Sequence, residues 1–361
     1  MCAAQSAGLA RRGHDVTVFT AAHGAATSEP GPPAVERQRP VISLGNAPLL
    51  PRLAALRGYD LIHLHQPFIF GAELSALGAL ASRTPVVSSF HNELRADGVK
   101  GALFRGYNAS AMRFALRRSA RIAVLSRDHA AAVAPLAAQL RRRPEAIDEV
   151  PNGVDPQRFA PGDAPEIRAR HGIPDEALVA MVCASLDHAH EYKRVDLAIE
   201  ATAALAGEHH VHLLVVGDGP LRAGLARLAA DLGVAERVTF AGELDGELPD
   251  HYRACDVLVL PSEWEAFGLV QIEAMASGKP VIVTSVAGAR VVSIDGEHGL
   301  HVRPGDGADL QRALRAIATM EPGARAAMGA RGRARVLERY TWERSVDALE
   351  ESLMAAVMES A

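Results

Sequence analysis

The sequence is poor in cysteine, lacks long apolar runs and carries no excess of positive charge. Its three cysteines (Cys2, Cys183 and Cys255) are odd in number and far apart. This pattern excludes a disulfide framework and a regularly spaced zinc site, and it favours a reducing, cytoplasmic environment. No apolar run approaches the roughly 20 residues that a membrane span requires. The net charge of −5 gives no basis for a nucleic-acid partner, and we expect none.

Short apolar runs alternate with Ala-, Leu- and Arg-rich stretches of helical period, which predicts parallel sheets wrapped by helices. The strands expected in the first half are Val16–Thr20, Val41–Leu44, Leu61–His65, Pro85–Phe90 and Ile122–Ser126. The strands expected in the second half are Leu178–Ala184, His212–Gly217, Val238–Ala241, Val257–Pro261 and Val281–Thr284. With 361 residues, the chain has room for two such α/β domains.

We expect four segments along the chain. Residues 1–150 form a first α/β domain, and residues 151–174, rich in Pro, Gly and Asp, form a linker. Residues 175–340 form a second α/β domain, and residues 341–361 form a C-terminal helix that returns to the first domain. The default ligand site of such domains lies at the carboxyl ends of the strands.

The first residues predict the end of a helix, Ala3–Arg12, followed directly by the strand Val16–Thr20. A doubly wound domain ordinarily begins with a strand and a glycine-rich turn before its first helix. We therefore expect a truncated first unit. We also expect the chain to be poorly active without that strand and turn.

The segment Asp256–Pro280 has the order strand, loop, helix that anion sites use. Val257–Pro261 predicts a buried strand, and Leu269–Ser277 predicts a helix that Gly278 and Pro280 end. The backbone N–H groups at the start of such a helix suit a phosphate.

Two carboxylates flank this helix start, Glu265 in the loop and Glu273 one turn beyond Leu269. Negative charge repels phosphate, but a carboxylate accepts two hydroxyl hydrogen bonds and so suits the vicinal diols of a ribose or hexose. A contact of Glu265 with the helix dipole and a solvated Glu273 explain the spacing more simply. The spacing alone does not separate these interpretations.

The surrounding residues resemble the retaining nucleotide-sugar glycosyltransferases with the GT-B fold, of the group 1 or family four type. Their signature E-x-F-G-L-x-x-x-E-A-M-A-x-G-x-P is matched from Glu265 to Pro280. Further segments that look like family segments follow in family order: Arg11–Thr20, Tyr59–Phe68, Pro85–Glu93, Val150–Phe159, Val215–Pro220 and Tyr340–Val346. The resemblance implies an α/β fold of two doubly wound, Rossmann-like domains.

The resemblance also implies the reaction. A hexose-type sugar would pass from a nucleoside-diphosphate sugar, bound by the second domain, to an unidentified acceptor with retention of anomeric configuration. That acceptor would be a small molecule, a polysaccharide or a lipid. Front-face attack assisted by the departing phosphate would replace a protein nucleophile.

The resemblance assigns roles to particular residues. Glu273 would bind the ribose, Glu265 the hydroxyls of the donor sugar, and Lys193 the diphosphate, whose charge grows as the bond breaks. His91 would contact the donor sugar near the reacting centre. The catalytic set is then His91, Glu265 and Lys193, and the donor-binding set adds Phe267, Gly268 and Leu269 through their N–H groups, Glu273, Gly217 and Asn152.

Each assignment has a simpler structural alternative. Lys193 would be a solvated lysine, His91 a hydrogen-bonding residue at a strand end, and Asn152 part of a simple Asn-Gly turn. His63 and His65 alternate on their strand and so share one face, where packing or an acceptor-side polar role is expected.

Two segments depart from the family pattern. The arginine usual before the lysine is absent from Ala184–Asp187, and Ala287–Val291 replaces G-G-x-P-E. The chain has no Asp-x-Asp pair, which agrees with donor binding without a metal ion. We expect neither a metal nor another cofactor.

Three other functions stay open. A dehydrogenase finds support in Gly217-x-Gly219, but Gly224 comes too late for G-x-G-x-x-G. A nucleotide-sugar epimerase on the same fold would need no acceptor. A catalytically impaired partner protein would agree with the truncated start and the absent arginine.

A basic stretch over Arg113–Arg121 has arginines three to four residues apart: Arg113, Arg117, Arg118 and Arg121. This spacing predicts one shared helix face. Such a face either makes a weak contact with the inner surface of an anionic membrane or is simply solvated.

Overall fold

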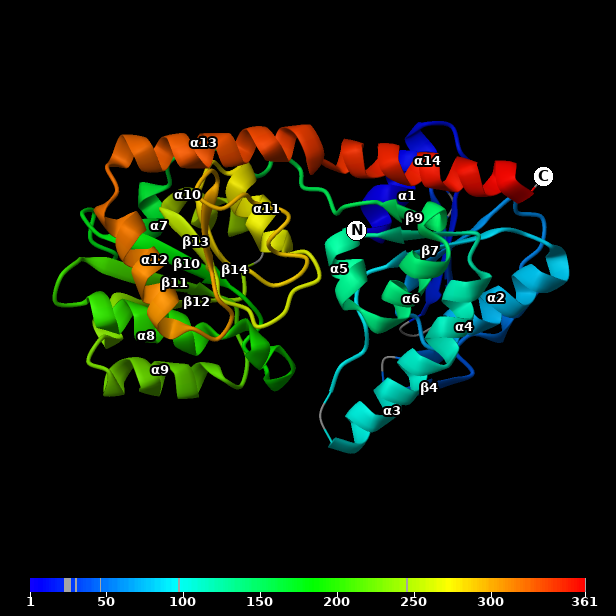
Figure 1. Ribbon diagram of the computed structural model, residues 1–361, viewed down its shortest axis with the longest axis horizontal. Helices are drawn as coiled ribbons and strands as arrows, with labels where there is room; N and C mark the ends of the chain where they lie inside the picture. The colour runs from blue at the N-terminus through cyan, green and yellow to red at the C-terminus, as the bar shows by residue number, and fades with distance from the viewer. Residues whose placement is uncertain (23–26, 30, 46, 97, 245, 361) are drawn as a thin grey trace. The chain divides into compact units, whose positions relative to one another are not determined.

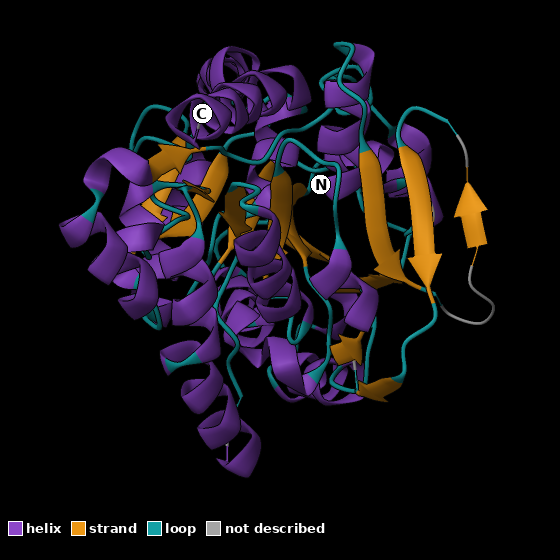
Figure 2. Ribbon diagram, turned by 90° about the vertical axis from the view of Figure 1, so that its right-hand side faces the viewer, coloured by secondary structure: helices purple, strands orange, loops and turns teal. Residues whose placement is uncertain are grey.

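The computed structural model describes residues 1–22, 27–29, 31–45, 47–96, 98–244 and 246–360. It contains two compact units (Figure 1). The first unit joins Met1–Gly153 to Trp342–Ala361, and the second unit is Val154–Thr341. Both units contain parallel sheets flanked by helices (Figure 2). The predicted α/β fold class is confirmed.

The second unit is built on a six-stranded sheet whose strand pairs are all parallel, in the order β12-β11-β10-β13-β14-β15. Its strands are β10 (Leu178–Cys183), β11 (Val211–Val216), β12 (Val238–Gly242), β13 (Val257–Leu260), β14 (Val281–Thr284) and β15 (Gly299–Val302). All residues of β11, β13 and β14 are buried, as continuous apolar runs predict. The strand order reverses between β10 and β13, which is the switch point where doubly wound sheets bind ligands.

Helices cover both faces of this sheet. One layer contains α8 (Val195–Leu205), α9 (Arg222–Asp231) and α12 (Gly307–Thr319). The other contains α7 (Pro165–Arg170), α10 (Leu248–Ala254), α11 (Leu269–Ala276) and α13 (Pro322–Arg339) (Figure 1). Short 3-10 turns, η3 (His188–Lys193) and η4 (Ala235–Arg237), complete the unit. The apolar core lies between the sheet and the α8–α9–α12 layer.

The first unit has a parallel sheet of order β6-β7-β8-β9. Its strands are β6 (Ile62–Gln66), β7 (Val86–Phe90), β8 (Arg121–Val124) and β9 (Ile147–Glu149). A second sheet, of order β1-β3-β2, contains β1 (Thr17–Ala21), β3 (Ala34–Gln38) and β2 (Thr27–Glu29). The helical elements are α1 (Cys2–Arg11), η1 (Pro51–Ala55), α2 (Gly71–Ser82), α3 (Gly98–Ala109), α4 (Ala111–Arg118), α5 (Arg127–Ala132), α6 (Ala134–Arg142), η2 (Pro144–Ala146) and α14 (Trp342–Ser360).

Two sequence expectations need correction. The run Val41–Leu44 was expected among the strands of the α/β sheets, but β4 (Ile42–Leu44) is exposed and pairs antiparallel with β5 (Ala47–Leu49) in a separate two-stranded sheet. The arginines of the basic stretch do not share one helix face, because α4 ends at Arg118 and Arg121 starts β8. There Arg121 forms ion pairs with Asp148 and Glu359.

None of the helices in the described ranges has the length and apolarity to cross a membrane.

Candidate active site

The loops that follow β10 and β13 bring the predicted residues of the second unit together. The loop after β10 leads through η3 to Lys193, and the loop after β13 leads through Glu265 into α11. Since β10 and β13 are neighbours in register, with Ala180 opposite Val257, both loops leave the same edge of the sheet. The site therefore lies at the switch point of the strand order.

Lys193 and Glu265 form an ion pair, with 2.6 Å between Nζ and Oε2. Their side chains are 16% and 10% exposed, so both charges are largely removed from water and neutralise each other. Ser262 Oγ lies 3.5 Å from the same carboxylate oxygen, and Thr284 donates a 2.6 Å hydrogen bond to the carbonyl of Ser262. Ser262 thus connects the carboxylate of the pair to Thr284 at the end of β14.

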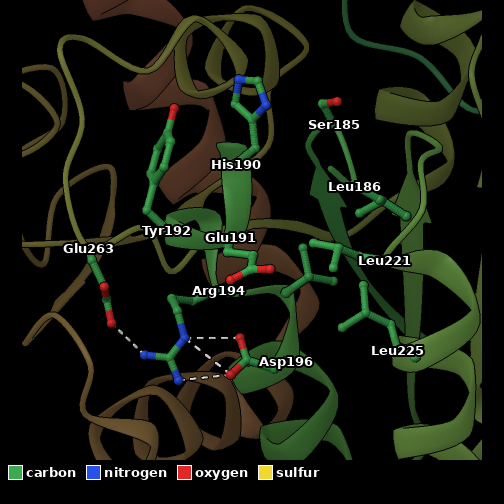
Figure 3. A pocket seen from close by; sticks show the side chains of 12 residues that line it. Ser185, Leu186, His190, Glu191, Tyr192, Arg194, Asp196, Leu221, Leu225 and Glu263 are labelled. Atoms are coloured by element: carbon green, nitrogen blue, oxygen red, sulfur yellow. Dashed lines mark hydrogen bonds and ion pairs between the residues drawn. The ribbon is translucent and has the colours of Figure 1, made fainter. Parts of the chain in front are cut away.

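A second set of contacts joins η3 to the β13 loop; we call it the η3 clasp. The ring of Tyr192 stacks on Trp264 with 4.4 Å between centroids, and Glu263 N–H donates to the carbonyl of Tyr192 at 2.8 Å. Arg194, whose φ of 52° is left-handed, pairs with Glu263 at 2.6 Å and also with Asp196 (Figure 3). These contacts fix the turn that carries Lys193.

A cavity of about 460 Å³ opens beside the η3 clasp (Figure 3). Leu186, Leu221 and Leu225 line it on the apolar side, and Arg194, Glu191 and Glu263 supply charged groups. Its volume is within the range of small-molecule sites.

Glycines allow the turn after β10 to pack closely on the end of β11. A Cβ at Gly217 would be too close to the carbonyl oxygen of Ala184, and one at Gly219 too close to that of Leu186. Both glycines also have positive φ, 126° and 150°. This packing accounts for Gly217 without a ligand, so its predicted donor-binding role stays a prediction.

Gly268, which has a φ of 81°, is the N-cap residue of α11. Phe267 is buried and packs edge-on against Tyr340, whereas Leu269 is 44% exposed. The first N–H groups of a helix have no partner within the helix, so they and the positive dipole end favour an anion. The role of Phe267, Gly268 and Leu269 as backbone donors stays a prediction.

Glu273 lies one turn into α11 and is bound by a residue that the sequence motif does not include. Tyr252 on α10 donates a 2.9 Å hydrogen bond to Oε2 of Glu273. Burial raises the pKa of Glu273 to about 7, and the Tyr252 hydrogen bond opposes that rise. The carboxyl group therefore titrates near neutral pH.

The predicted residues of the first unit follow the ends of its parallel strands. His91 follows β7, and its Nε2 lies 3.0 Å from Nδ1 of His65. Burial lowers the pKa of His91 to about 3 and that of His65 to about 4, so both are neutral at pH 7. His63, on the same face as His65, instead hydrogen-bonds Ser89 at 2.7 Å.

Four buried polar atoms near the carboxyl ends of β6, β7, β8 and β9 have no hydrogen-bond partner among the described residues. They are Gln66 Oε1, His91 Nδ1, His129 Nδ1 and Asn152 Oδ1. An unpaired buried polar atom costs about 1–3 kcal/mol, and an ordered water or a polar ligand would satisfy these four atoms. The sequence analysis did not single out Gln66, the last residue of β6, or His129, which lies in α5, the helix that follows β8.

The predicted site residues belong to different units. The second unit brings together Lys193, Glu265, Glu273 and the backbone of Phe267–Leu269, and Gly217 supports the turn beside them. His91 and Asn152 belong to the first unit. Within the described part of the chain, no three His, Cys, Asp or Glu side chains are grouped to hold a metal ion.

Two family models match the chain. Residues 2–158 match the family described as Glycosyltransferase Family 4, and residues 163–335 match the family described as Glycosyl transferases group 1. The two matches together span most of both units.

Curated proteins of similar sequence include D-inositol 3-phosphate glycosyltransferases. That of Stackebrandtia nassauensis is 39% identical over 222 residues, covering 58% of this chain and 48% of that protein. That of Saccharomonospora viridis is 31% identical over 381 residues, covering 94% of this chain and 85% of that protein. In several of these matches the chain spans about half the length of the relative.

Solved structures agree in fold. Sucrose-phosphate synthase from Thermosynechococcus elongatus superposes with a TM-score of 0.77 and 25% identity, covering 99% of this chain and 92% of that chain. HepE of Anabaena in complex with UDP-glucose has a TM-score of 0.67 and 22% identity, covering 82% and 79% of the two chains.

Proposed function

This chain belongs to the group 1 and family 4 glycosyltransferases with the GT-B fold, and from that premise we propose that it transfers a hexose-type sugar from a nucleoside-diphosphate sugar to an acceptor. We further propose that the anomeric configuration is retained. The arrangement of Lys193, Glu265 and the start of α11 at the switch point carries this proposal.

In the proposed reaction Lys193 exchanges its partner. In the structure Lys193 pairs with Glu265. When the diphosphate enters beside the N-terminus of α11, the ammonium group binds phosphate, and the carboxylate of Glu265 is released to accept hydrogen bonds from sugar hydroxyls. Because each charge is already placed and partly buried, little reorganisation is needed when charge develops on the leaving phosphate.

The cleaved bond joins the anomeric carbon to the distal phosphate oxygen, and the departing nucleoside diphosphate carries the bonding electron pair. Lys193 and the N–H groups of Phe267, Gly268 and Leu269 stabilise that charge. With these cationic and dipolar groups in place, we propose that donor binding requires no divalent ion. The acceptor hydroxyl loses its proton to the departing phosphate as the new bond forms on the same face.

In the first unit we propose that His91 binds a sugar hydroxyl through Nδ1, the buried atom without a partner among the described residues. Since His65 engages Nε2, Nδ1 is the nitrogen available for a ligand. Asn152 offers a comparable unpaired Oδ1. The acceptor assay should begin with D-inositol 3-phosphate, because relatives carry that compound in their names.

The test is a thermal-shift screen with uridine, guanosine and adenosine diphosphate sugars, with and without EDTA. A ligand at a hundredfold excess over its Kd stabilises the native state by about 2.7 kcal/mol, or roughly 5–10 °C. We expect one nucleotide class to give such a shift, and Lys193→Met to abolish it. Lys100→Met, which removes an exposed lysine of the first unit, should leave the shift unchanged.

Product analysis then separates the alternatives. We expect a glycoside only when donor and acceptor are both present, with the anomeric configuration of the donor. A new nucleotide sugar formed from donor alone would point to an epimerase. Absence of any nucleotide-dependent shift would contradict the proposed donor site.

A further inference from the structure

Tyr252 and Glu273 form a buried hydrogen-bonded pair between α10 and α11. The Tyr252 hydroxyl donates to Oε2 of Glu273 at 2.9 Å, and Tyr252 has no exposed surface. Phe159 packs edge-on against the Tyr252 ring with 5.8 Å between centroids. The aromatic contact and the hydrogen bond together position the phenol.

The surroundings of Glu273 favour its neutral form. Burial is the main cause that raises the pKa of Glu273 to about 7. The Tyr252 hydrogen bond and then the charge of Arg158 act in the opposite direction. Cys183, at the end of β10, also faces the pair, and its own pKa is raised to about 12 by burial and then by the Glu273 charge. Tyr252 is thus the nearest neutral donor that stabilises the carboxylate form.

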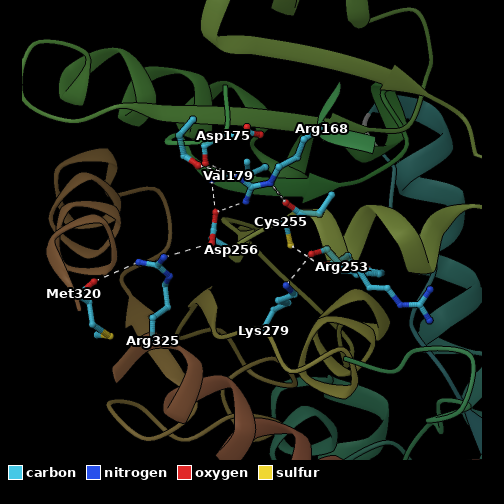
Figure 4. A network of polar contacts seen from close by, with 12 residues as sticks. Arg168, Asp175, Val179, Arg253, Cys255, Asp256, Lys279, Met320 and Arg325 are labelled. Atoms are coloured by element: carbon cyan, nitrogen blue, oxygen red, sulfur yellow. Dashed lines mark hydrogen bonds and ion pairs between the residues drawn. The ribbon is translucent and has the colours of Figure 1, made fainter. Parts of the chain in front are cut away.

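The end of α10 is anchored by side chains from three segments (Figure 4). The carbonyl of Arg253 accepts from Lys279 Nζ at 2.9 Å, and that of Ala254 accepts from Arg168 Nε at 2.9 Å. The carbonyl of Tyr252 itself accepts from the thiol of Cys255 at 3.3 Å.

Three successive carbonyls at the end of α10 therefore accept hydrogen bonds. Two of the donors, Lys279 and Arg168, are cations that complement the negative end of the helix dipole. Arg168 also pairs with Asp256, directly before β13, at 2.8 Å. This network ties α10, and so Tyr252, to the framework of the sheet.

A buried tyrosine hydroxyl needs an acceptor wherever it lies, so the bond to Glu273 has a purely structural explanation. Two features indicate that the bond also serves the proposed binding of the nucleotide. The acceptor is the carboxylate to which the resemblance to the glycosyltransferase family assigns the ribose, and Lys279 and Arg168 anchor the end of α10 that carries the phenol. A carboxylate that must accept hydroxyl hydrogen bonds has to be ionised and held in one plane.

We propose that Tyr252 is a positioning residue for Glu273, whose carboxyl group it holds oriented toward the ribose of the nucleotide. This inference rests on the proposed function. The second oxygen of Glu273, Oε1, is the one we assign to the ribose hydroxyls, because Oε2 is engaged by Tyr252.

The test compares Tyr252→Phe with the unaltered protein in titrations with the nucleotide sugar that gives the largest thermal shift. The two phosphates of a nucleotide sugar carry no proton that titrates near pH 7, so the pH dependence reports the protein. We expect Kd to rise roughly tenfold at pH 7.5, as for loss of a hydrogen bond to a charged group. We also expect the pH midpoint of binding to move upward, so that the loss shrinks toward pH 9.

A matched control exists in the first unit. Tyr107 donates to Glu73 Oε1 at 2.8 Å, so Tyr107→Phe removes the same kind of bond. It should leave Kd and the pH midpoint unchanged. In a double-mutant cycle, Tyr252→Phe should add little to Glu273→Gln, because the phenol acts through the carboxylate.

A uniform weakening at every pH, or an additive effect in the cycle, would overturn the proposal while leaving the donor site intact. If Tyr252→Phe does not fold, Lys279→Met loosens the end of α10 without altering the phenol. A smaller upward shift of the same midpoint is then expected, and an unchanged midpoint contradicts the proposal. Failure of the unaltered protein to bind any of the three nucleotide classes would instead overturn the proposed function.

Discussion

Folding and the proposed ribose binding favour different protonation states of the Glu273 carboxyl group. Its carboxyl group lies in the second unit, where burial raises its pKa from 4.5 to about 7. The ribose binding that we propose for Glu273 needs the ionised form, yet ionising a buried carboxylate weakens the folded state. A group of this kind is expected to make the protein less stable at the pH where it works.

Glu273→Gln should therefore stabilise the protein in alkaline solution. Because the folded pKa is raised, the stabilising contribution of the protonated acid is complete below pH 4.5 and is lost as the pH rises through 7. The amide does not ionise, so the variant should gain up to about 3 kcal/mol in unfolding free energy at pH 8 and little at pH 5. Urea unfolding at the two pH values measures the difference.

Glu338→Gln, at an exposed position of α13, is the control and should change the unfolding free energy by less than about 0.5 kcal/mol at either pH. The Glu273 variant should also show a smaller nucleotide-induced thermal shift. An equal loss of stability at pH 5 and pH 8 would show that the carboxyl group is not strained by burial.

At the level of elements, the loop after β13 depends on a glycine far along the chain. Gly288 has a φ of 88°, and a Cβ there would lie 2.5 Å from the carbonyl oxygen of Ala266 and 2.6 Å from that of Glu265. The loop that presents Glu265 thus rests directly on the Gly288 backbone. From the sequence, Ala287–Val291 was notable only because it lacks the acidic residue of the family pattern G-G-x-P-E.

Gly288→Ala should displace the loop and weaken donor binding. Left-handed strain contributes about 1–2 kcal/mol and the two backbone clashes add to it, so we expect a loss of at least about 3 kcal/mol. Gly296→Ala is the matched control, since Gly296 has a φ of 75° and no atom within 4 Å of its Cβ position. It should lose only the strain and keep the nucleotide-induced thermal shift. Equal effects of both changes in unfolding assays would argue against the loop contact.

Whether a strand could be predicted from the sequence depends on how completely it is buried. Strands β11, β13 and β14 are buried throughout and read as apolar runs, so their prediction is confirmed. Strands β3 and β9 contain several charged or polar residues and were not predicted. Strand order is also hidden from the sequence, because β10 and β13 pair although more than 70 residues separate them.

The candidate site, too, could be predicted from the sequence only in part. The motif around Glu265 and Glu273 could be found because its residues are close in the chain. The pairing of Lys193 with Glu265, 72 residues apart, and the hydroxyl that Tyr252 supplies depend on the loops' folded paths. Those contacts, like the unpaired atoms of Gln66 and His129, depend on the folded structure and could not be predicted from the sequence.

At the scale of the whole molecule, the chain passes between its two units twice, after Gly153 and after Thr341. The last helix, α14, therefore completes the first unit, where it packs against α1 and strands β7, β8 and β9. Val346 and Leu349 of α14 are buried with Leu9 and Val150 in one apolar cluster. Polar contacts add to this packing, among them Ser345 with Gln5, Asp347 and Glu350 with Arg12, Ser352 with Asp148, and Glu359 with Arg121.

Truncation after Thr341 should therefore unfold the first unit and spare the second. Removing two fully buried aliphatic side chains costs about 2–5 kcal/mol each, which is comparable to the whole stability of a domain. The second unit keeps its sheet, Lys193, Glu265 and Glu273 within Val154–Thr341. Limited proteolysis should then leave a fragment of about that extent, and a thermal transition that shifts with the nucleotide sugar should persist. Removal of Ser360 and Ala361 alone should change neither transition, whereas loss of both transitions on truncation would show that the second unit depends on the first for its fold.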